Sequence, residues 1–245
     1  MAQAPATVAA GCGPNSLAVV VPTLDEERAI GACLNAIGDA AGVAVVVSDG
    51  GSRDATVATV RREFPRARVV AGSPGRGVQL NRGAAAVAAD AYVFVHADCR
   101  LPAGWAAAVR AALATPGVAL GCFRLHTEPA AGRGGGAAAR WWWRLLDLRS
   151  RGLGLPYGDQ ALFVRREAFA AVGGFPAIPL MEDVEFVRRC LARGRLARLP
   201  LAVRTTARRF ARRPVRARLC TATFPLLYRL GVSPERLARW YGDVR

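Results

Sequence analysis

Lysine is absent from this chain of 245 residues, and all 34 of its basic residues are arginine. Isoleucine and asparagine occur three times each, whereas alanine is about a fifth of the chain. This composition is typical of a GC-rich genome. The preference for arginine over lysine therefore says little about function, and the positions of the arginines are more informative.

Three further absences narrow the class of protein. No apolar run approaches the roughly 18–20 residues with which a helix crosses a bilayer. The first sixteen residues contain no Lys or Arg, so they lack the basic region that begins a secretory signal peptide. None of the six cysteines forms a C-x-x-C pair, which argues against a zinc knuckle or a redox motif. A cytoplasmic protein with free thiols is expected.

The chain is rich in apolar residues and in positive charge. Hydrophobic residues make up 52% of it, enough to bury a sizeable core. The formal net charge of +16 is unevenly spread: residues 1–122 hold 10 Arg against 9 acidic residues, and residues 123–245 hold 24 Arg against 9. Such a basic half either attracts nucleic acid, an anionic membrane or a phosphate-rich ligand, or is a solvated surface.

Apolar runs alternate with helical patterns over the first half of the chain. Strands are predicted at residues 17–21, 43–48, 68–71 and 92–96. Helices are predicted at residues 26–40, 54–64, 78–89 and 102–113. Pro22 is expected to end the first strand, and Thr23 with Glu26 fits a capping box for the first helix. The alternation is typical of a parallel α/β sheet with both faces covered.

Four polar side chains follow the ends of predicted strands: Asp25, Asp49, Arg76 and Asp98. Ligands of parallel α/β sheets bind at the carboxyl ends of the strands, so these side chains are expected to converge on one rim. Plainer interpretations exist for each carboxylate. Asp49 fits an Asx-turn, Asp98 a cap on the following turn, and Asp25 a helix N-terminal charge.

The second half is less regular. A Gly/Ala-rich loop is predicted at residues 130–139, and Trp141–Trp143 begins an apolar and basic helix-like stretch. These tryptophans fit either a platform for a bound substrate or internal packing. Glu185 and Arg189 can pair at i,i+4 on an amphipathic helix. The other predicted elements are a loop and strand at 157–165, that amphipathic helix at 182–193 and a last helix that begins at Ser233.

Six motifs occur in a fixed order: VVPTLDEE at 20–27, VVSDGGSRD at 46–54, GRGVQLNRG at 75–83, FVHADCRLP at 94–102, GDQALFVRR at 158–166 and GGFPAIPLMEDVEF at 173–186. With this order and spacing, the chain resembles the family 2 glycosyltransferases. The resemblance implies the GT-A fold, a Rossmann-like, mostly parallel central sheet flanked by helices, with a C-terminal acceptor-side helical region. It covers about residues 17–200.

A narrower resemblance extends almost to the C-terminus. It is to a short, soluble subgroup described as arsenosugar-biosynthesis glycosyltransferases associated with radical-SAM genes. The matching segments lie at residues 96–102, 158–160, 179–183, 206–210 and 230–239.

The resemblance implies roles for individual residues. Asp183 matches the catalytic base, with Glu182 beside it. Asp98 matches the last Asp of the family's DxD element, which binds Mn²⁺ or Mg²⁺. His96 stands where the first Asp of that element usually lies, and it fits a metal ligand, a ribose contact or a packed strand-end residue. The residues expected to bind the nucleotide sugar are Pro22, Thr23, Asp25, Glu26, Asp49, Gly50, Arg76, Asn81, His96, Ala97, Asp98 and Asp159.

The implied activity is transfer of a sugar from a nucleoside-diphosphate sugar to a small or lipid-linked acceptor, by metal-assisted inverting displacement. The processive QxxRW element is missing, so polymer synthesis is not expected. The chain is expected to divide into a disordered N-terminal segment, a nucleotide-sugar-binding half, an acceptor and catalytic-base half of the same domain, and a basic helical tail, at residues 1–16, 17–122, 123–205 and 206–245.

Two other classes of protein compete with this one. A nucleotidyltransferase acting on sugar phosphates needs an N-terminal Gly-rich segment ending in Lys or Arg, where this chain has the sequence PTLD at 22–25. A nucleic-acid-binding protein fits the charge, but no RNA or DNA motif is present, and Asp49, Asp98 and Asp183 would repel phosphate without a metal. No nucleic-acid partner is expected, whereas peripheral contact with an anionic membrane stays open.

Overall fold

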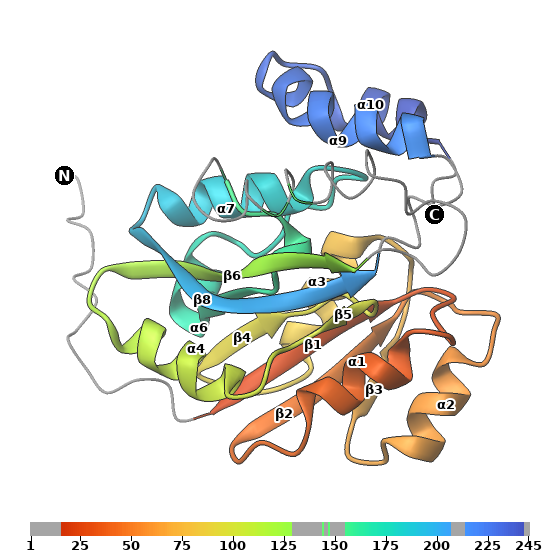
Figure 1. The fold of residues 1–245 in the computed structure, drawn as a ribbon, viewed down its shortest axis with the longest axis vertical. Coiled ribbons are helices and arrows are strands. Elements are labelled where there is room, and N and C mark those ends of the chain that lie inside the picture. Colours follow the sequence, from red (N-terminus) through yellow and green to blue (C-terminus); the bar gives the residue numbers. More distant parts are fainter. Residues whose placement is uncertain (1–15, 129–143, 145–146, 148–154, 207–213, 243–245) are drawn as a thin grey trace.

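The computed structural model describes residues 16–128, 144, 147, 155–206 and 214–242. Its centre is an eight-stranded sheet in the order β3-β2-β1-β4-β7-β6-β8-β5 (Figure 1). Parallel pairing joins β1 to β2, β1 to β4, β2 to β3 and β6 to β8. The strands are β1 Leu17–Thr23, β2 Val43–Asp49, β3 Arg68–Ala71, β4 Ala91–Phe94, β5 Cys99–Arg100, β6 Val118–Glu128, β7 Leu162–Arg165 and β8 Arg195–Thr206.

Helices cover both faces of the sheet. They are α1 Ile30–Ile37, α2 Thr56–Glu63, α3 Arg76–Ala85, α4 Trp105–Ala114, α6 Arg166–Ala171, α7 Glu182–Leu191, α9 Pro214–Arg229 and α10 Pro234–Tyr241, with a short 3₁₀ helix η1 at Gly158–Gln160. No helix within the described ranges has both the length and the apolarity needed to cross a membrane.

Strand β1 shows why its sequence is continuously apolar. Leu17, Val19 and Val21 belong to the core that α1 and α4 cover, whereas Ala18 and Val20 belong to the core under α3 and α7. Side chains alternate between the faces of a strand, so a strand buried on both faces needs apolar residues at every position.

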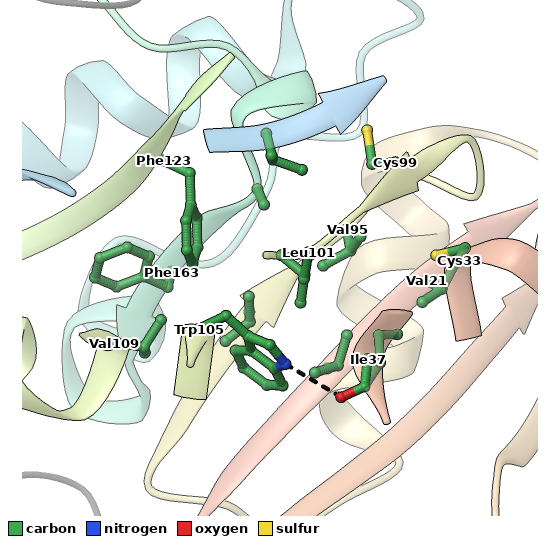
Figure 2. Packing of buried hydrophobic residues seen from close by; sticks show 14 of the residues in the cluster. Val21, Cys33, Ile37, Val95, Cys99, Leu101, Trp105, Val109, Phe123 and Phe163 are labelled. Atoms are coloured by element: carbon green, nitrogen blue, oxygen red, sulfur yellow. Dashed lines mark hydrogen bonds between the residues drawn. The ribbon is translucent and has the colours of Figure 1, made fainter. Parts of the chain in front are cut away.

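The core under α1 and α4 is anchored by a buried tryptophan (Figure 2). The indole Nε1 of Trp105 donates to the backbone oxygen of Ile37 at 3.1 Å, which satisfies its only polar group. Phe123 and Phe163 pack edge-to-face in the same core, with ring centroids 5.7 Å apart. This core therefore joins α1 and α4 to strands from both halves of the chain.

A third, smaller core joins the C-terminal helices to α7. Met181 and Val184 pack there with three buried side chains of α9 and α10, namely Cys220, Phe224 and Leu237. The hydroxyl of Ser233 accepts the backbone N–H of Arg236, so the predicted last helix begins where the sequence indicated.

The mostly parallel, helix-flanked α/β sheet expected from the sequence is confirmed. Several boundaries were wrong. Pro22 does not end β1, which continues to Thr23. Beyond Val20, β1 still pairs with β2 but no longer with β4. One side of the strand is therefore unpaired there, as in an edge strand, where a proline is tolerated. The capping box was also wrong, because the hydroxyl of Thr23 donates to Asp49 and α1 begins only at Ile30.

The sequence patterns missed two long strands: β6, which begins at Val118 and continues into the second half, and β8. Strand β8 contains three Arg and Pro200, and its side chains are mostly half-buried or exposed, so it lacks the apolar run of a central strand. The five cysteines among the described residues form no disulfide, and Glu185 pairs with Arg189 at 3.0 Å, as predicted. The predictions for 1–15, 130–139, Trp141–Trp143 and 207–213 lie outside the described residues.

Two helical glycines provide a matched test of the packing between α3 and β1. A Cβ added at Gly83 in α3 would lie 2.3 Å from Val20 Cγ1, whereas one added at Gly31 in α1 would meet its nearest atom at 4.0 Å. We expect Gly83→Ala to lower the free energy of unfolding by about 1–2 kcal/mol, because overpacking exceeds the gain in helix propensity. Gly31→Ala should raise it by about 0.5–1 kcal/mol. Equal effects in urea denaturation would contradict this packing.

Candidate active site

The carboxyl ends of β1 and β2 carry two loops that hydrogen bonds join. Asp25 donates its backbone N–H to the Ser52 hydroxyl at 2.9 Å, and its carboxylate accepts the N–H of Arg53 at 2.7 Å. The backbone N–H of Glu26 donates to the Thr56 hydroxyl at 2.8 Å. Hydrogen bonds thus join the loops at these two strand ends, which form the predicted rim. Asp25 is exposed there, and Glu26 is buried.

Asp49, at the end of β2, lies at the centre of this rim. One carboxylate oxygen accepts the N–H groups of Gly51 and Ser52, both at 2.9 Å. The other accepts the hydroxyls of Ser52 at 2.5 Å and Thr23 at 3.1 Å. Burial would raise the pKa of Asp49, but these four hydrogen bonds together hold the pKa below its ordinary value. The carboxylate therefore organises the loop in which the nucleotide contact was predicted.

Gln79, in α3, is a buried rim residue that the sequence reasoning missed. Its side-chain amide donates to the backbone oxygens of Thr23 at 2.8 Å and Ser48 at 2.9 Å, and so joins β1 to β2. A Cβ at Gly50 would lie 3.0 Å from that amide, which explains the glycine there. Position 79 shares a motif with Arg76 and Asn81, but its residue type carried no specific signal.

Arg76 and Glu182 join the two halves of the chain. The guanidinium Nε of Arg76, at the start of α3, donates to the buried carboxylate of Glu182, at the start of α7. Burial alone would lower the pKa of Arg76, but the Glu182 and Asp183 carboxylates raise it, so the guanidinium stays charged. Asn81 makes a second link between the halves, because its amide exchanges hydrogen bonds of 2.8 and 2.9 Å with the backbone of Phe175.

His96, Asp98 and Cys99 form a cluster just past β4. One ligand atom from each lies within 4.8 Å of the other two. Asp98 and His96 are half-buried. The carboxylate oxygen of Asp98 suits Mn²⁺ or Mg²⁺ bound together with phosphate oxygens, whereas the imidazole of His96 offers a nitrogen, which these hard ions take less readily. The thiol of Cys99 is buried and donates to Asp98 Oδ1 at 3.8 Å. Burial and the Asp98 carboxylate raise its pKa, which favours the protonated thiol. The carboxylate of Asp98 therefore fits the expected ion, and His96 lies close enough to be a second ligand.

Gly158, the first residue of η1, lies between this cluster and the start of α7. Its N–H donates to Asp183 Oδ2 at 2.8 Å. A Cβ added there would lie 2.9 Å from His96 Nε2 and 3.2 Å from Asp183 Oδ2. The predicted base and the predicted metal ligand thus approach the same point of the backbone. Met181, in the left-handed region at φ 67°, turns the chain into α7 just before Glu182 and Asp183.

The other predicted binding residues lie on the same edge of the sheet. Thr23 and Ala97 are almost completely buried, so the backbone is what they can offer a ligand. Asp159 lies in η1 next to Gly158, and its backbone oxygen accepts the Cys99 thiol at 3.7 Å. The arrangement brings a candidate cation ligand, His96, and a candidate proton acceptor, Asp183, to within about 3 Å of the position that a Cβ of Gly158 would occupy.

Parallel α/β sheets bind nucleotides at the carboxyl ends of their strands. The acidic side chains described above lie at that end of this sheet. The model of glycosyl transferase family 2 matches residues 18–173, which is more than half of the chain. The chain therefore belongs to this family, as its motifs indicated. No curated protein is similar enough to count as a relative of this chain.

Solved structures share the fold at low sequence identity. The mannosyltransferase PcManGT from Pyrobaculum calidifontis, in complex with GDP-Man and Mn²⁺, is 20% identical over 96% of this chain and 71% of its own, with a TM-score of 0.66. S. aureus TarS 1-349 is 16% identical over 94% of this chain and 71% of its own, with a TM-score of 0.58. The full S. aureus TarS matches over 78% of this chain at 18% identity and a TM-score of 0.57, and the match spans 36% of TarS.

The hydrogen bonds to Asp49 predict a pH-dependent contribution to stability. Because folding lowers its pKa, the carboxylate stabilises the native state above its unfolded-state pKa of 3.8, and this stabilisation is lost as the pH falls through the folded-state pKa. We expect Asp49→Asn to reduce the free energy of unfolding at neutral pH, with a difference from the wild type that shrinks below about pH 4. Urea denaturation at several pH values measures this.

Asp39→Asn is the control for that experiment, because the Asp39 side chain is 82% exposed. A difference between Asp49→Asn and the wild type that is the same at pH 7 and at pH 3 contradicts the role of the charged form.

Proposed function

We propose that this protein transfers a sugar from a nucleoside-diphosphate sugar to an acceptor. The donor would lie at the carboxyl ends of β1, β2 and β4, and the acceptor would lie next to the start of α7. The proposal rests on the close approach of two side chains to the Cβ position of Gly158. One is His96, which clusters with Asp98, and the other is Asp183. A glycosyltransferase needs a diphosphate-stabilising group and a proton acceptor on opposite sides of one sugar carbon. Membership of glycosyl transferase family 2 supports this activity.

The donor is proposed to lie along the rim built by Asp25 and Asp49. The loops there are held rigid by hydrogen bonds, which reduces the entropy lost when a ligand binds. The complexes of S. aureus TarS 1-349 with UDP and with UDP-GlcNAc, and of PcManGT with GDP-Man, make UDP- and GDP-sugars the donors to test first.

Asp98 is the proposed ligand of a divalent ion, Mn²⁺ or Mg²⁺, with His96 as a second ligand. The bound ion would supply electrostatic stabilisation of the nucleoside diphosphate as it leaves. Arg76 adds a fixed positive charge at the start of α3, where the unpaired N–H groups of a helix also favour an anion. Its ion pair with Glu182 leaves the other guanidinium nitrogens as donors for a phosphate oxygen.

Asp183 is the proposed general base. Each of its carboxylate oxygens accepts one backbone N–H, from Gly158 and from Val184, both at 2.8 Å. A carboxylate oxygen has two lone pairs, so each retains one for the hydroxyl of an acceptor. Removal of that proton would activate the acceptor for attack on the anomeric carbon from the side opposite the leaving diphosphate. Such a direct displacement inverts the anomeric centre.

The acceptor is proposed to be either a small metabolite or a lipid-linked molecule. The resemblance to the subgroup described for arsenosugar biosynthesis makes a small sugar-containing metabolite the first candidate. Release of pyrophosphate in place of a nucleoside diphosphate would instead identify a nucleotidyltransferase, and would contradict the proposal.

Two substitutions test the proposed base and metal ligand. We expect Asp183→Asn and Asp98→Ala each to lower turnover of a nucleotide sugar by at least ~100-fold, the usual scale for a lost base or charge stabiliser. The measurement is release of nucleoside diphosphate with Mn²⁺ or Mg²⁺ present. Near-normal turnover by either variant would rule out the role assigned to that residue, and Asp39→Asn serves as the surface control.

A further inference from the structure

Helix α9 exposes a line of leucines that the core does not use. Leu219, Leu226 and Leu230 are 61%, 60% and 72% exposed. Their spacing of seven and four residues places them on one side of a helix. The N–H of Leu230 donates to the oxygen of Leu226 at 3.0 Å, so the helical turn continues through Leu230. We refer to Leu219, Leu226 and Leu230 as the leucine stripe.

The leucine stripe is separate from the face by which α9 is attached to the protein. Cys220 and Phe224 are 6% exposed and pack in the third core with Leu237 of α10. Figure 1 shows α9 and α10, in dark blue, as the outermost layer of the molecule, beyond α7. A helix that is attached by one apolar side and exposes a second one is typical of an interaction site.

The exposed residues of α9 and α10 also include positive charge and an aromatic side chain. Residues 214–242 contain five Arg and one acidic residue. Arg229, at the end of α9, and Arg236 and Arg239, in α10, are all exposed. Trp240 of α10 is 48% exposed. Exposed leucines combined with arginine and tryptophan are the composition of helices that lie in the interface of an anionic bilayer.

We propose that α9 and α10 form a docking surface for an anionic membrane, with the leucine stripe inserted among the acyl chains and the arginines on the lipid headgroups. Charge complementarity favours this occupant over a second copy of the chain. A two-fold symmetric contact uses the same surface on both copies, so this arginine-rich surface, whose one acidic residue is Glu235, would face another surface of the same charge, and like charges repel. Membrane binding by this surface does not depend on the proposed transfer of a sugar.

Vesicle flotation tests the docking surface with the whole chain. We expect the protein to float with vesicles of phosphatidylcholine and phosphatidylglycerol (7:3) and to stay behind with phosphatidylcholine alone. Leu226→Ser with Leu230→Ser should weaken binding to the anionic vesicles by at least roughly 10-fold, because two apolar side chains no longer enter the bilayer. The double change Arg236→Glu with Arg239→Glu should weaken it by roughly 20-fold or more.

The matched control is Arg62→Glu with Arg66→Glu, which makes the same change in net charge on the exposed surface near α2. It should retain most of the binding, and circular dichroism should show that all variants fold. Equal losses in the two charge variants would mean that net charge alone attracts the protein, and would overturn the proposal. So would wild-type binding to neither vesicle, unchanged binding by the leucine variant, or a dimer in light scattering that the leucine variant abolishes.

Discussion

The absence of a side chain at Gly158 is the constraint on which the candidate site depends. The N–H of this residue donates to the Asp183 carboxylate at 2.8 Å. Because Gly158 has no Cβ, His96 Nε2 can lie only 2.9 Å from the position that a Cβ would occupy. His96 comes from the loop after β4, and Asp183 from the first turn of α7. Without this close approach, the acidic rim and the start of α7 would be two separate features. With it, the proposed cation-binding cluster and the proposed proton acceptor approach the same point of the backbone.

Links between the two halves of the chain keep this arrangement in place. The ion pair of Arg76 with Glu182 joins the first turn of α3 to the first turn of α7, and Asn81 joins α3 to the backbone of Phe175. Loss of Arg76 would leave the buried carboxylate of Glu182 without its compensating charge, so the first turn of α7 depends on Arg76. Gln79 fixes the ends of β1 and β2 from the same helix. Helix α3 therefore positions the rim, and it also anchors α7.

Much of the first half was predictable because its signals are local. A continuous apolar run identifies a strand buried on both faces, and β1 and β4 follow this pattern. The motif order also predicted the family. The missed features depend on contacts distant in sequence: β8, with its three Arg and Pro200, is a strand because it pairs with β6. Likewise, the role of Gln79 depends on the approach of α3 to two strand ends, which no local pattern contains.

In the proposed mechanism, the carboxyl ends of β1, β2 and β4 bind a nucleoside diphosphate together with a cation, while Asp183 takes a proton from the acceptor. Calorimetric titration of the protein with UDP and with GDP, each with and without Mn²⁺, tests this most directly. We expect Mn²⁺ to strengthen the binding of one of these nucleotides, Asp98→Ala to abolish this gain, and Asp183→Asn to retain it. Nucleotide binding that is indifferent to Mn²⁺, or no binding of either nucleotide, would contradict the account.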